Sequence, residues 1–224
     1  ALGTTLVVMA ATIAMAVGFQ RDNVDLQFVE SYAWIPTFGI NFALGVDAIA
    51  LVLILMSTIL APIVVLAGWN EAHGGRWSVK TFYILILVLE TMMIGVFAAT
   101  DLFLFYVIFE AMLIPVYFLI GGYGTGERSA AAVKFLLYSL FGGLLMLASI
   151  IALYVMSGAQ GGHTFDIDKL SQLQMSSTTQ NLLFLGFFIA FAIKAPVWPF
   201  HTWLPDAAKS ATPGTSVLLL GVLD

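Results

Sequence analysis

The sequence predicts an all-α membrane protein that crosses the bilayer several times. Of its 224 residues, 61% are hydrophobic and only 9% are charged, and the mean hydropathy is +1.01. In soluble domains about a quarter of the residues are charged, so this composition excludes that class. The apolar residues also gather in runs of about 20 residues, which is the length that a membrane helix needs.

The apolar runs place the expected spans within a single transmembrane domain at residues 1–224. The run at residues 81–120 would make a helix of about 60 Å, twice the hydrocarbon thickness. It must therefore hold two antiparallel spans, with a turn near residues 98–101 where Thr100 or Asp101 caps the second span. We expect spans at residues 1–19, 46–67, 79–98, 101–120, 129–156 and 181–200, and the start of a further span at residues 215–224.

The two ends of the sequence suggest a longer protein. Ala1 is not a methionine, and the opening apolar run has neither a basic segment nor a clear cleavage site of a signal peptide. The last apolar run, at residues 215–223, is too short to cross a bilayer. We therefore interpret the chain as a fragment that ends inside a helix.

Basic residues in the connections predict the orientation of the helices. Arg76, Lys80 and Arg128 lie in or beside the connections at residues 68–80 and 121–129. Lysine and arginine are enriched in cytoplasmic loops. We therefore expect these two connections on the cytoplasmic side of the membrane.

Two connections have patterns of their own. In residues 21–41, Val24, Leu26 and Phe28 alternate with polar residues, which predicts a surface strand on the outer side. Another connection contains four glycines, and glycine-rich loops can cradle phosphates. It lacks a preceding strand and a P-loop lysine, so we interpret it as a flexible connection between helices. These glycines are Gly121, Gly122, Gly124 and Gly126.

Glu110 is a carboxylate in the middle of an apolar run. It lies about 13 Å into its helix, close to the bilayer centre. A charge at that depth costs roughly 2.5 to 3.5 kcal/mol on insertion scales, so such residues face a polar interior and usually serve a function. Pro115 removes a backbone donor and clashes with the carbonyl of Ala111, which predicts a kink beside the carboxylate. Glu110 either binds and releases a proton or is a fixed, paired acid.

Lys194 is the second charge inside the expected membrane region. Pro196 and Pro199 follow it and terminate regular helix, so we expect a break near residues 196–199 with Lys194 at the negative end of the preceding helix. Transporters build ion sites from such interrupted helices. A desolvated lysine can exchange its proton, whereas a lysine that snorkels to the interface has no such role.

Lys134 and His201 complete the set of candidate site residues. Lys134 is only about 6 Å from the start of its expected helix, so its position fits both proton transfer and snorkelling. His201 follows the helix break, where an imidazole can relay protons or hold a loop by a hydrogen bond.

Glu90 lies near mid-depth and can pair with another helix or extend a polar chain. Asp101 and Asp47 are expected to cap helices at the surface.

The composition limits which cofactors this chain can hold. It has no cysteine, so it supplies no thiolate for an iron–sulfur cluster, a metal or a disulfide. His73 and His163 lie in polar connections, so no pair of mid-membrane histidines is available for haem. The net charge of −5 includes no basic patch for nucleic acid. We expect no metal site, no cofactor site and no nucleic-acid partner.

Four segments resemble a known family. They are WIPTFGINFALGVDAIAL at residues 34–51, LFLFYVIFEAMLIPVYFLIGG at 102–122, AAVKFLLY at 131–138 and FAIKAPVWPFHTWLPDA at 191–207. Together they resemble the antiporter-like subunits of respiratory complex I, and FEAMLIPVYFLI is most similar to the chain M branch, which includes mitochondrial subunit 4. After HTWLPDA the family usually carries a histidine and a glutamate, whereas this chain has Ala208 and Ser210.

The resemblance implies a fragment of a fourteen-helix fold with inverted repeats, an antiporter-like bundle that contains a broken helix. It implies a proton-translocating membrane-arm subunit of an NADH:quinone oxidoreductase in the bacterial cell membrane. It also implies that FMN, iron–sulfur clusters, NADH and quinone belong to partner subunits. The expected neighbours are other membrane-arm subunits, including antiporter-like chains, and the lipid bilayer.

The family pattern also implies roles for the candidate residues. Glu110 matches the glutamate of the fifth helix, Lys134 the lysine of the sixth, and Lys194 the lysine of the broken seventh, while His201 also matches. The resemblance implies that Glu110 and Lys194 act as a charge switch on a hydrated midplane axis, which continues past the end of this chain. Two alternatives stay open: a subunit of a multisubunit sodium/proton antiporter, and a structural scaffold whose buried charges only specify helix packing.

Overall fold

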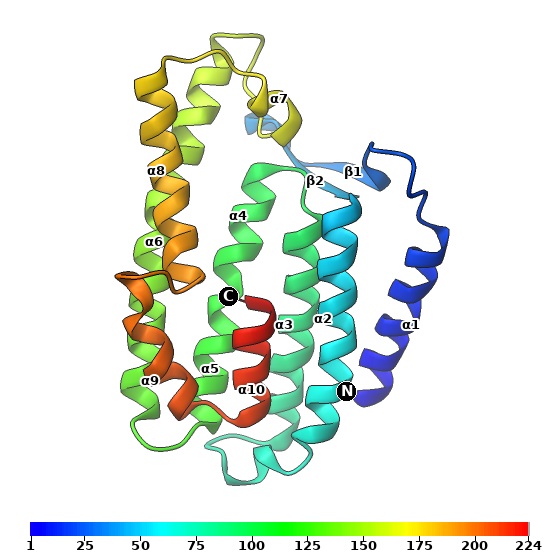
Figure 1. Ribbon diagram of the computed structural model, residues 1–224, viewed down its shortest axis with the longest axis vertical. Coiled ribbons are helices and arrows are strands. Elements are labelled where there is room, and N and C mark those ends of the chain that lie inside the picture. The colour runs from blue at the N-terminus through cyan, green and yellow to red at the C-terminus, as the bar shows by residue number, and fades with distance from the viewer. Residues whose placement is uncertain (224) are drawn as a thin grey trace.

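The computed structural model describes residues 1–223, and its long helices run along one common direction (Figure 1). Within these residues, five helical segments are long and apolar enough to cross a membrane. They are Ala48–Ala67 (α2), Val79–Ala98 (α3), Leu102–Tyr123 (α4 with α5), Arg128–Gly158 (α6) and Ser177–Lys194 (α8). Two shorter apolar helices are Leu2–Gly18 (α1) and Pro213–Val222. The predicted all-α membrane class is confirmed.

Short polar side chains begin the membrane helices. The first N–H groups of a helix have no partner inside it, so a side-chain oxygen before the helix stabilises its start. Asp47 accepts a hydrogen bond of 2.7 Å from the backbone N–H of Ala50 at the start of α2. Ser78 accepts one of 3.3 Å from Thr81 in α3, and Ser176 does the same for α8. These three helices thus start at a capping side chain, whereas α6 has no side-chain cap within the described residues.

A two-stranded antiparallel hairpin covers one end of the bundle (Figure 1). β1 (Gln27–Ile35) and β2 (Ile40–Val46) are joined by a single 3-10 turn, η1 (Pro36–Phe38). Gly39 follows with a φ of 68°, a left-handed conformation that glycine adopts without steric cost. The strand expected in residues 21–41 is present, but it begins later than its alternating residues suggested. The sequence analysis missed β2 because INFALGV lacks regular alternation of polar and apolar residues.

Asp101 joins the hairpin to the helices. Its Oδ1 accepts hydrogen bonds from the N–H groups of Phe103 and Leu104 at 2.9 and 3.0 Å, so it caps α4 (Leu102–Ala111). Its Oδ2 accepts a third, of 2.9 Å, from the N–H of Asn41 in β2. The prediction of a cap was right, but the expected place at the surface was wrong. Asp101 is buried, because β2 and the segment around Asp166 close over it.

Two membrane helices are interrupted beside a charged residue. α4 ends at Ala111, and α5 (Leu113–Tyr123) begins after Met112, just before Pro115. This interruption lies where the ring of Pro115 was expected to clash with the carbonyl of Ala111, one turn earlier. α8 ends at Lys194, just before Pro196, which confirms the predicted broken helix.

The chain continues after α8 through short elements. They are η3 (Phe200–Thr202), α9 (Trp203–Ser210), α10 (Pro213–Leu218) and the π-helical turn η4 (Leu219–Leu223). The span expected at residues 181–200 therefore starts inside α8 and extends past its end. The further span expected at residues 215–224 falls in α10 and η4, and its last residue, Asp224, lies outside the described residues. The short helix α7 (Ile167–Ser171) lies between α6 and α8 in the sequence.

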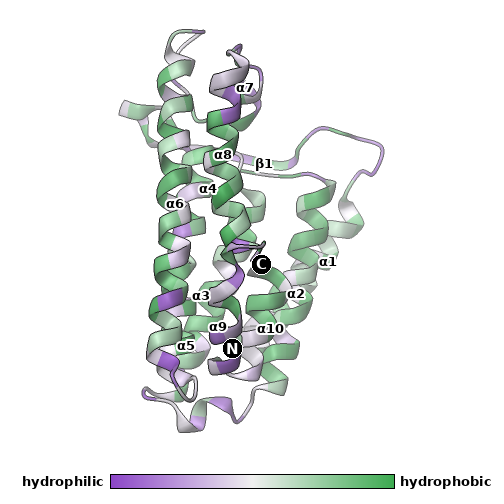
Figure 2. Cartoon of the chain, turned by 60° about the vertical axis from the view of Figure 1, so that its left-hand side comes forward, coloured by the Kyte–Doolittle hydropathy of each residue, from purple (hydrophilic) through white to green (hydrophobic). Residues whose placement is uncertain are grey.

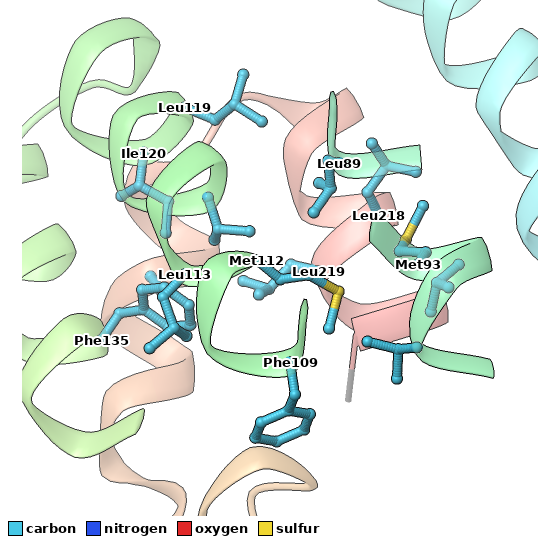
Figure 3. Packing of buried hydrophobic residues seen from close by; sticks show 14 of the residues in the cluster. Leu89, Met93, Phe109, Met112, Leu113, Leu119, Ile120, Phe135, Leu218 and Leu219 are labelled. Atoms are coloured by element: carbon cyan, nitrogen blue, oxygen red, sulfur yellow. The ribbon is translucent and has the colours of Figure 1, made fainter. Parts of the chain in front are cut away.

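Apolar side chains fill the space between the helices. Figure 3 shows residues of α3, α4, α5, α6 and α10 packed against one another, including Leu89, Met93, Phe109, Leu113, Phe135 and Leu218. Large apolar side chains such as Leu182, Phe184 and Leu137 are also exposed on the outside. Figure 2 shows hydrophobic residues along the helices and hydrophilic ones mainly in the connections. This distribution suits a protein whose outer surface contacts lipid.

Small residues bring α6 and α8 close together. A Cβ atom added to Gly142 in α6 would lie 3.1 Å from the Cα atom of Ala190 in α8. A Cβ atom added to Gly186 in α8 would collide with the hydroxyl of Ser149 in α6. Small residues at an interface let two helix backbones approach closely. This contact places the end of α8, with Lys194, beside α6.

Candidate functional site

Lys194 is a buried cation at the last residue of α8. Only 5% of the residue is exposed. Its Nζ lies 5.2 Å from the centre of the Phe109 ring in α4 and 5.4 Å from that of Phe135 in α6. The negative face of an aromatic ring attracts an ammonium group at this separation. The side chain of Lys194 therefore lies inside the described helices and not on their outer surface.

The helix break beside Lys194 follows from one missing backbone donor. Pro196 has no N–H to donate to the carbonyl of Ala192, its partner in a regular helix. The N–H of Val197 donates to that carbonyl instead, at 2.8 Å. The helix ends here, and its last carbonyl groups form the negative end of the helix dipole. Lys194 is the basic residue in this last turn, so the dipole favours its charge.

Glu110 lies near the end of α4, beside the interruption at Met112. Its carboxylate occupies the space that the absent side chain of Gly143 leaves on α6, because a Cβ atom there would collide with the carboxylate. The Oε1 atom is buried and has no hydrogen-bond partner within residues 1–223. The residue before it, Phe109, carries the ring whose centre lies 5.2 Å from the Nζ of Lys194. The tertiary structure thus brings these two predicted site residues within electrostatic reach of each other.

Lys134 forms a salt bridge with a residue that the sequence analysis did not single out. Its Nζ lies 2.7 Å from Oδ2 of Asp206, so the pair joins α6 to α9. Their side chains are 36% and 53% exposed. Both residues line an open cavity of about 480 Å³, together with Glu127 and Lys209. Lys134 therefore lies at a polar opening of the bundle, and no pattern in the sequence pointed to Asp206 as its partner.

His201 lies in η3, directly before the start of α9. Its Nδ1 is buried and has no hydrogen-bond partner in the described part of the chain. The next residue, Thr202, shares a hydrogen bond of 2.7 Å with the hydroxyl of Tyr138, which holds η3 against α6. The segment of His201 thus contacts the same helix as Lys134, but the structure assigns no proton acceptor to the imidazole.

Glu90 is a second acid inside the apolar region. It is buried in α3, and its Oε1 has no hydrogen-bond partner among residues 1–223. Its neighbours in sequence, Leu89 and Met93, belong to the apolar core. The sequence indicated only the depth of Glu90, and the structure shows that this acid is buried, like the carboxylate oxygen of Glu110.

The arrangement supports proton exchange more directly than other chemistry. Lys194 and Glu110 come from two interrupted helices, and both contact α6, one at Phe135 and the other at Gly143. Both groups can gain and lose protons, and broken helices in a membrane allow such groups to face a polar interior. Residues 1–223 contain no cluster of three or more histidine, aspartate or glutamate side chains placed to hold a metal ion.

Comparison with known proteins reveals related sequences. Residues 99–223 match the family model described as NADH:quinone oxidoreductase/Mrp antiporter, TM. Over 253 aligned positions, the chain is 44% identical to NADH-quinone oxidoreductase subunit M of Mycobacterium tuberculosis, covering 98% of this chain and 46% of that protein. It is 39% identical over 223 positions to NADH-ubiquinone oxidoreductase chain 4 of Arabidopsis thaliana, covering 99% of this chain and 43% of that protein.

A solved structure has a similar fold. The chain superposes on a chain of respiratory complex I from Thermus thermophilus with bound NADH, with a TM-score of 0.80 and 29% identity. The superposition covers 96% of this chain and 44% of the other. The chain therefore spans less than half the length of the relatives that it matches.

Proposed function

The chain belongs to the NADH:quinone oxidoreductase/Mrp antiporter membrane family, and we propose that it carries part of the proton path of a membrane-arm subunit of NADH:quinone oxidoreductase. The family resemblance predicted from the four sequence segments is confirmed. The observation that carries the proposal is the buried Lys194 at the break after α8, whose Nζ lies over the ring of Phe109, the residue next to Glu110. Ionisable groups inside a membrane are costly, and they mark ion paths and proton relays.

In this proposal, Glu110 and Lys194 exchange protons when the geometry between them changes. The rings of Phe109 and Phe135 stabilise the charged form of Lys194. The interruptions at Met112 and after Lys194 let α4 and α8 shift without breaking a continuous helical hydrogen-bond ladder. A conformational or electric signal from elsewhere in the complex changes the separation of the two charges, and with it the protonation of each.

Lys134 and His201 extend the path toward one end of the bundle in this proposal. Lys134 and Asp206 face the open cavity, so water can reach them. His201 lies on the segment that joins the break after α8 to α9, and imidazole can pass protons near neutral pH. Protons would enter between α6 and α9 and continue inward to Lys194 and Glu110.

The wider setting is part of the same proposal. The chain acts as one subunit of a proton-translocating oxidoreductase, and FMN, iron–sulfur clusters, NADH and quinone are held by partner subunits. Its neighbours are other membrane-arm subunits, including antiporter-like chains. The described helices make it a membrane protein, and the proposed location is the bacterial cell membrane with lipid around the apolar outer faces.

A second candidate is a subunit of a multisubunit sodium/proton antiporter. The family description that matches residues 99–223 names Mrp antiporters together with the oxidoreductase. The two functions differ in their driving force. Proton movement that depends on a sodium gradient, and not on NADH or quinone, would identify the antiporter.

The proposal is tested in inverted membrane vesicles that carry the full-length protein with Glu110→Gln. Glutamine keeps the size of the side chain but cannot bind and release a proton. We expect NADH-driven proton translocation to be lost, while the complex still assembles on native gels of the same membranes. Glu30→Gln is the matched control, because Glu30 is exposed on β1, and we expect that variant to pump at the parent rate.

Two other outcomes would decide against the proposal. Normal pumping with Glu110→Gln would mean that the charge only specifies helix packing. The scaffold alternative makes a further prediction: exchanging the two charges, with Glu110→Lys and Lys194→Glu together, would restore assembly and leave pumping normal. We expect the exchanged variant to assemble poorly or not to pump.

A further inference from the structure

Ser139 is a buried hydroxyl on α6 that does not bond to its own helix. It is 5% exposed, and its Oγ has no hydrogen-bond partner within residues 1–223. Other buried hydroxyls donate to the carbonyl one turn earlier, at 2.7 to 3.3 Å; these are Thr12, Ser57, Thr58 and Ser149. Serine in a helix usually forms this local bond. The hydroxyl of Ser139 is therefore available to the interior of the bundle.

Ser139 lies between the contacts of Lys194 and Glu110 on α6. Phe135, Ser139 and Gly143 follow at four-residue intervals, so they share one face of the helix with about 6 Å between successive positions. The Nζ of Lys194 lies 5.4 Å from the Phe135 ring, and the carboxylate of Glu110 fills the space beside Gly143. Along this face the order is thus ammonium, hydroxyl, carboxylate.

A water molecule is the natural partner of both groups. The Oγ of Ser139 and the Oε1 of Glu110 are both buried and without a partner in the described chain. Buried polar groups in proteins are hydrogen-bonded, to protein or to ordered water. One water with two hydrogen bonds of about 2.8 Å spans up to about 5.5 Å, which suits groups one helical turn apart.

We propose that Ser139 binds a water molecule against Glu110 and relays protons between Glu110 and Lys194. The inference rests on the proposed function, since it adds a residue to that path. The O–H bond of protonated Glu110 breaks as its proton passes to the water. The water gives a proton to the Ser139 oxygen. When a change in geometry brings Ser139 and Lys194 into hydrogen-bond contact, the original hydroxyl proton of Ser139 passes to the neutral amine of Lys194. Water and serine keep their proton count, Glu110 becomes a carboxylate and Lys194 an ammonium.

The test compares three variants of the full-length subunit in its assembled complex. Ser139→Ala removes only the hydroxyl, and Ser139→Thr keeps one at the same position. Ser149→Ala is the matched control, because Ser149 is also buried on α6 but donates to the carbonyl of Leu145 at 3.3 Å. The measured quantities are the rate of NADH-driven proton translocation in inverted vesicles, and assembly on native gels.

We expect Ser139→Ala to lower proton translocation about tenfold with normal assembly, which corresponds to losing one hydrogen bond to a charged group. Ser139→Thr should restore most of the rate, and Ser149→Ala should match the parent. Retention of a hydroxyl matters for a relay, whereas a purely packing role of Ser139 would tolerate alanine better than the larger threonine.

The relay is overturned by normal pumping with Ser139→Ala, by no recovery with assembled Ser139→Thr, or by an equal loss with Ser149→Ala. Glu110→Gln distinguishes a failure of the relay from a failure of the proposed function. Lost pumping with Glu110→Gln together with normal pumping of Ser139→Ala removes only the relay. Normal pumping with Glu110→Gln removes the proposed function itself.

Discussion

The indole Nε1 of Trp203 donates a hydrogen bond of 2.8 Å to the carbonyl oxygen of Ile193. In a regular helix that carbonyl would accept from the N–H of Val197. Here the N–H of Val197 donates to the carbonyl of Ala192 instead, because Pro196 has no N–H. Trp203 thus satisfies a carbonyl that the helix break leaves open, in the residue directly before Lys194. The bond fixes the start of α9 against the end of α8.

Trp203→Phe should destabilise this junction. The phenyl ring leaves the carbonyl of Ile193 buried without a donor and fills less of a fully buried site, which together costs about 2 to 4 kcal/mol. The measurement is the unfolding temperature of the detergent-purified protein, with Trp198→Phe as the control because Trp198 is largely exposed. Equal unfolding temperatures for both variants would contradict the assigned bond.

Gly143→Ala should displace the carboxylate of Glu110. The added methyl group would collide with that carboxylate. The side chains must shift to make room, which lowers the free energy of unfolding by about 1 to 3 kcal/mol. We expect at least about a tenfold fall in proton translocation, because small displacements at a reacting group cost far more in rate than in stability. Gly3→Ala is the control, since a Cβ atom on Gly3 meets no atom within 4 Å; a parent rate for Gly143→Ala would argue against this placement of Glu110.

Asp101→Ala should destabilise the fold more than Asp47→Ala. Asp101 accepts from Phe103, Leu104 and Asn41, whereas Asp47 accepts from Ala50 alone. Loss of a single helix cap lowers the free energy of unfolding by about 1 kcal/mol. Buried N–H donors that are left without an acceptor lower it by about 1 to 3 kcal/mol more. Thermal unfolding of the two variants measures the difference, and a smaller effect at Asp101 would contradict its role in joining the hairpin to α4.

Phe109→Leu should remove one of the two cation–π contacts of the Lys194 ammonium. Its Nζ lies 5.2 Å from the centre of this ring, and a desolvated contact of this kind is worth about 0.5 to 2 kcal/mol. We expect proton translocation to fall by roughly two- to thirtyfold if the full contact is lost. Phe184→Leu, on the exposed face of α8, should leave pumping unchanged, and equal losses in both variants would point to general packing instead.

The pair of Lys134 and Asp206 should contribute little to stability. Both side chains are more than a third exposed, and solvent screens such pairs to about 0.2 to 1 kcal/mol. A double-mutant cycle of Lys134→Gln and Asp206→Asn on thermal stability should give a coupling energy in that range. A coupling above about 2 kcal/mol would instead indicate that the pair is buried in the assembled complex.

The membrane class of the fold was predictable because hydropathy and length constrain it directly. Within a bilayer every backbone polar group must be satisfied inside the protein, so long apolar runs become helices regardless of what they pack against. The breaks beside Glu110 and Lys194 were also predictable, since proline acts on the residues next to it. The hairpin was only partly predictable, because its second strand depends on pairing and on the hydrogen bond from Asn41 to Asp101.

From the sequence by itself one could determine that Glu110 and Lys194 are charges within apolar runs and that each lies beside a helix interruption. Only the tertiary structure decided that both contact one face of α6, through Gly143 and Phe135, and that Lys134 pairs with Asp206. The physical reason is that the cost of a charge in lipid depends on its position along one helix. The partners of that charge depend instead on which helices pack together, and an all-round apolar helix carries no periodic signal for its neighbours.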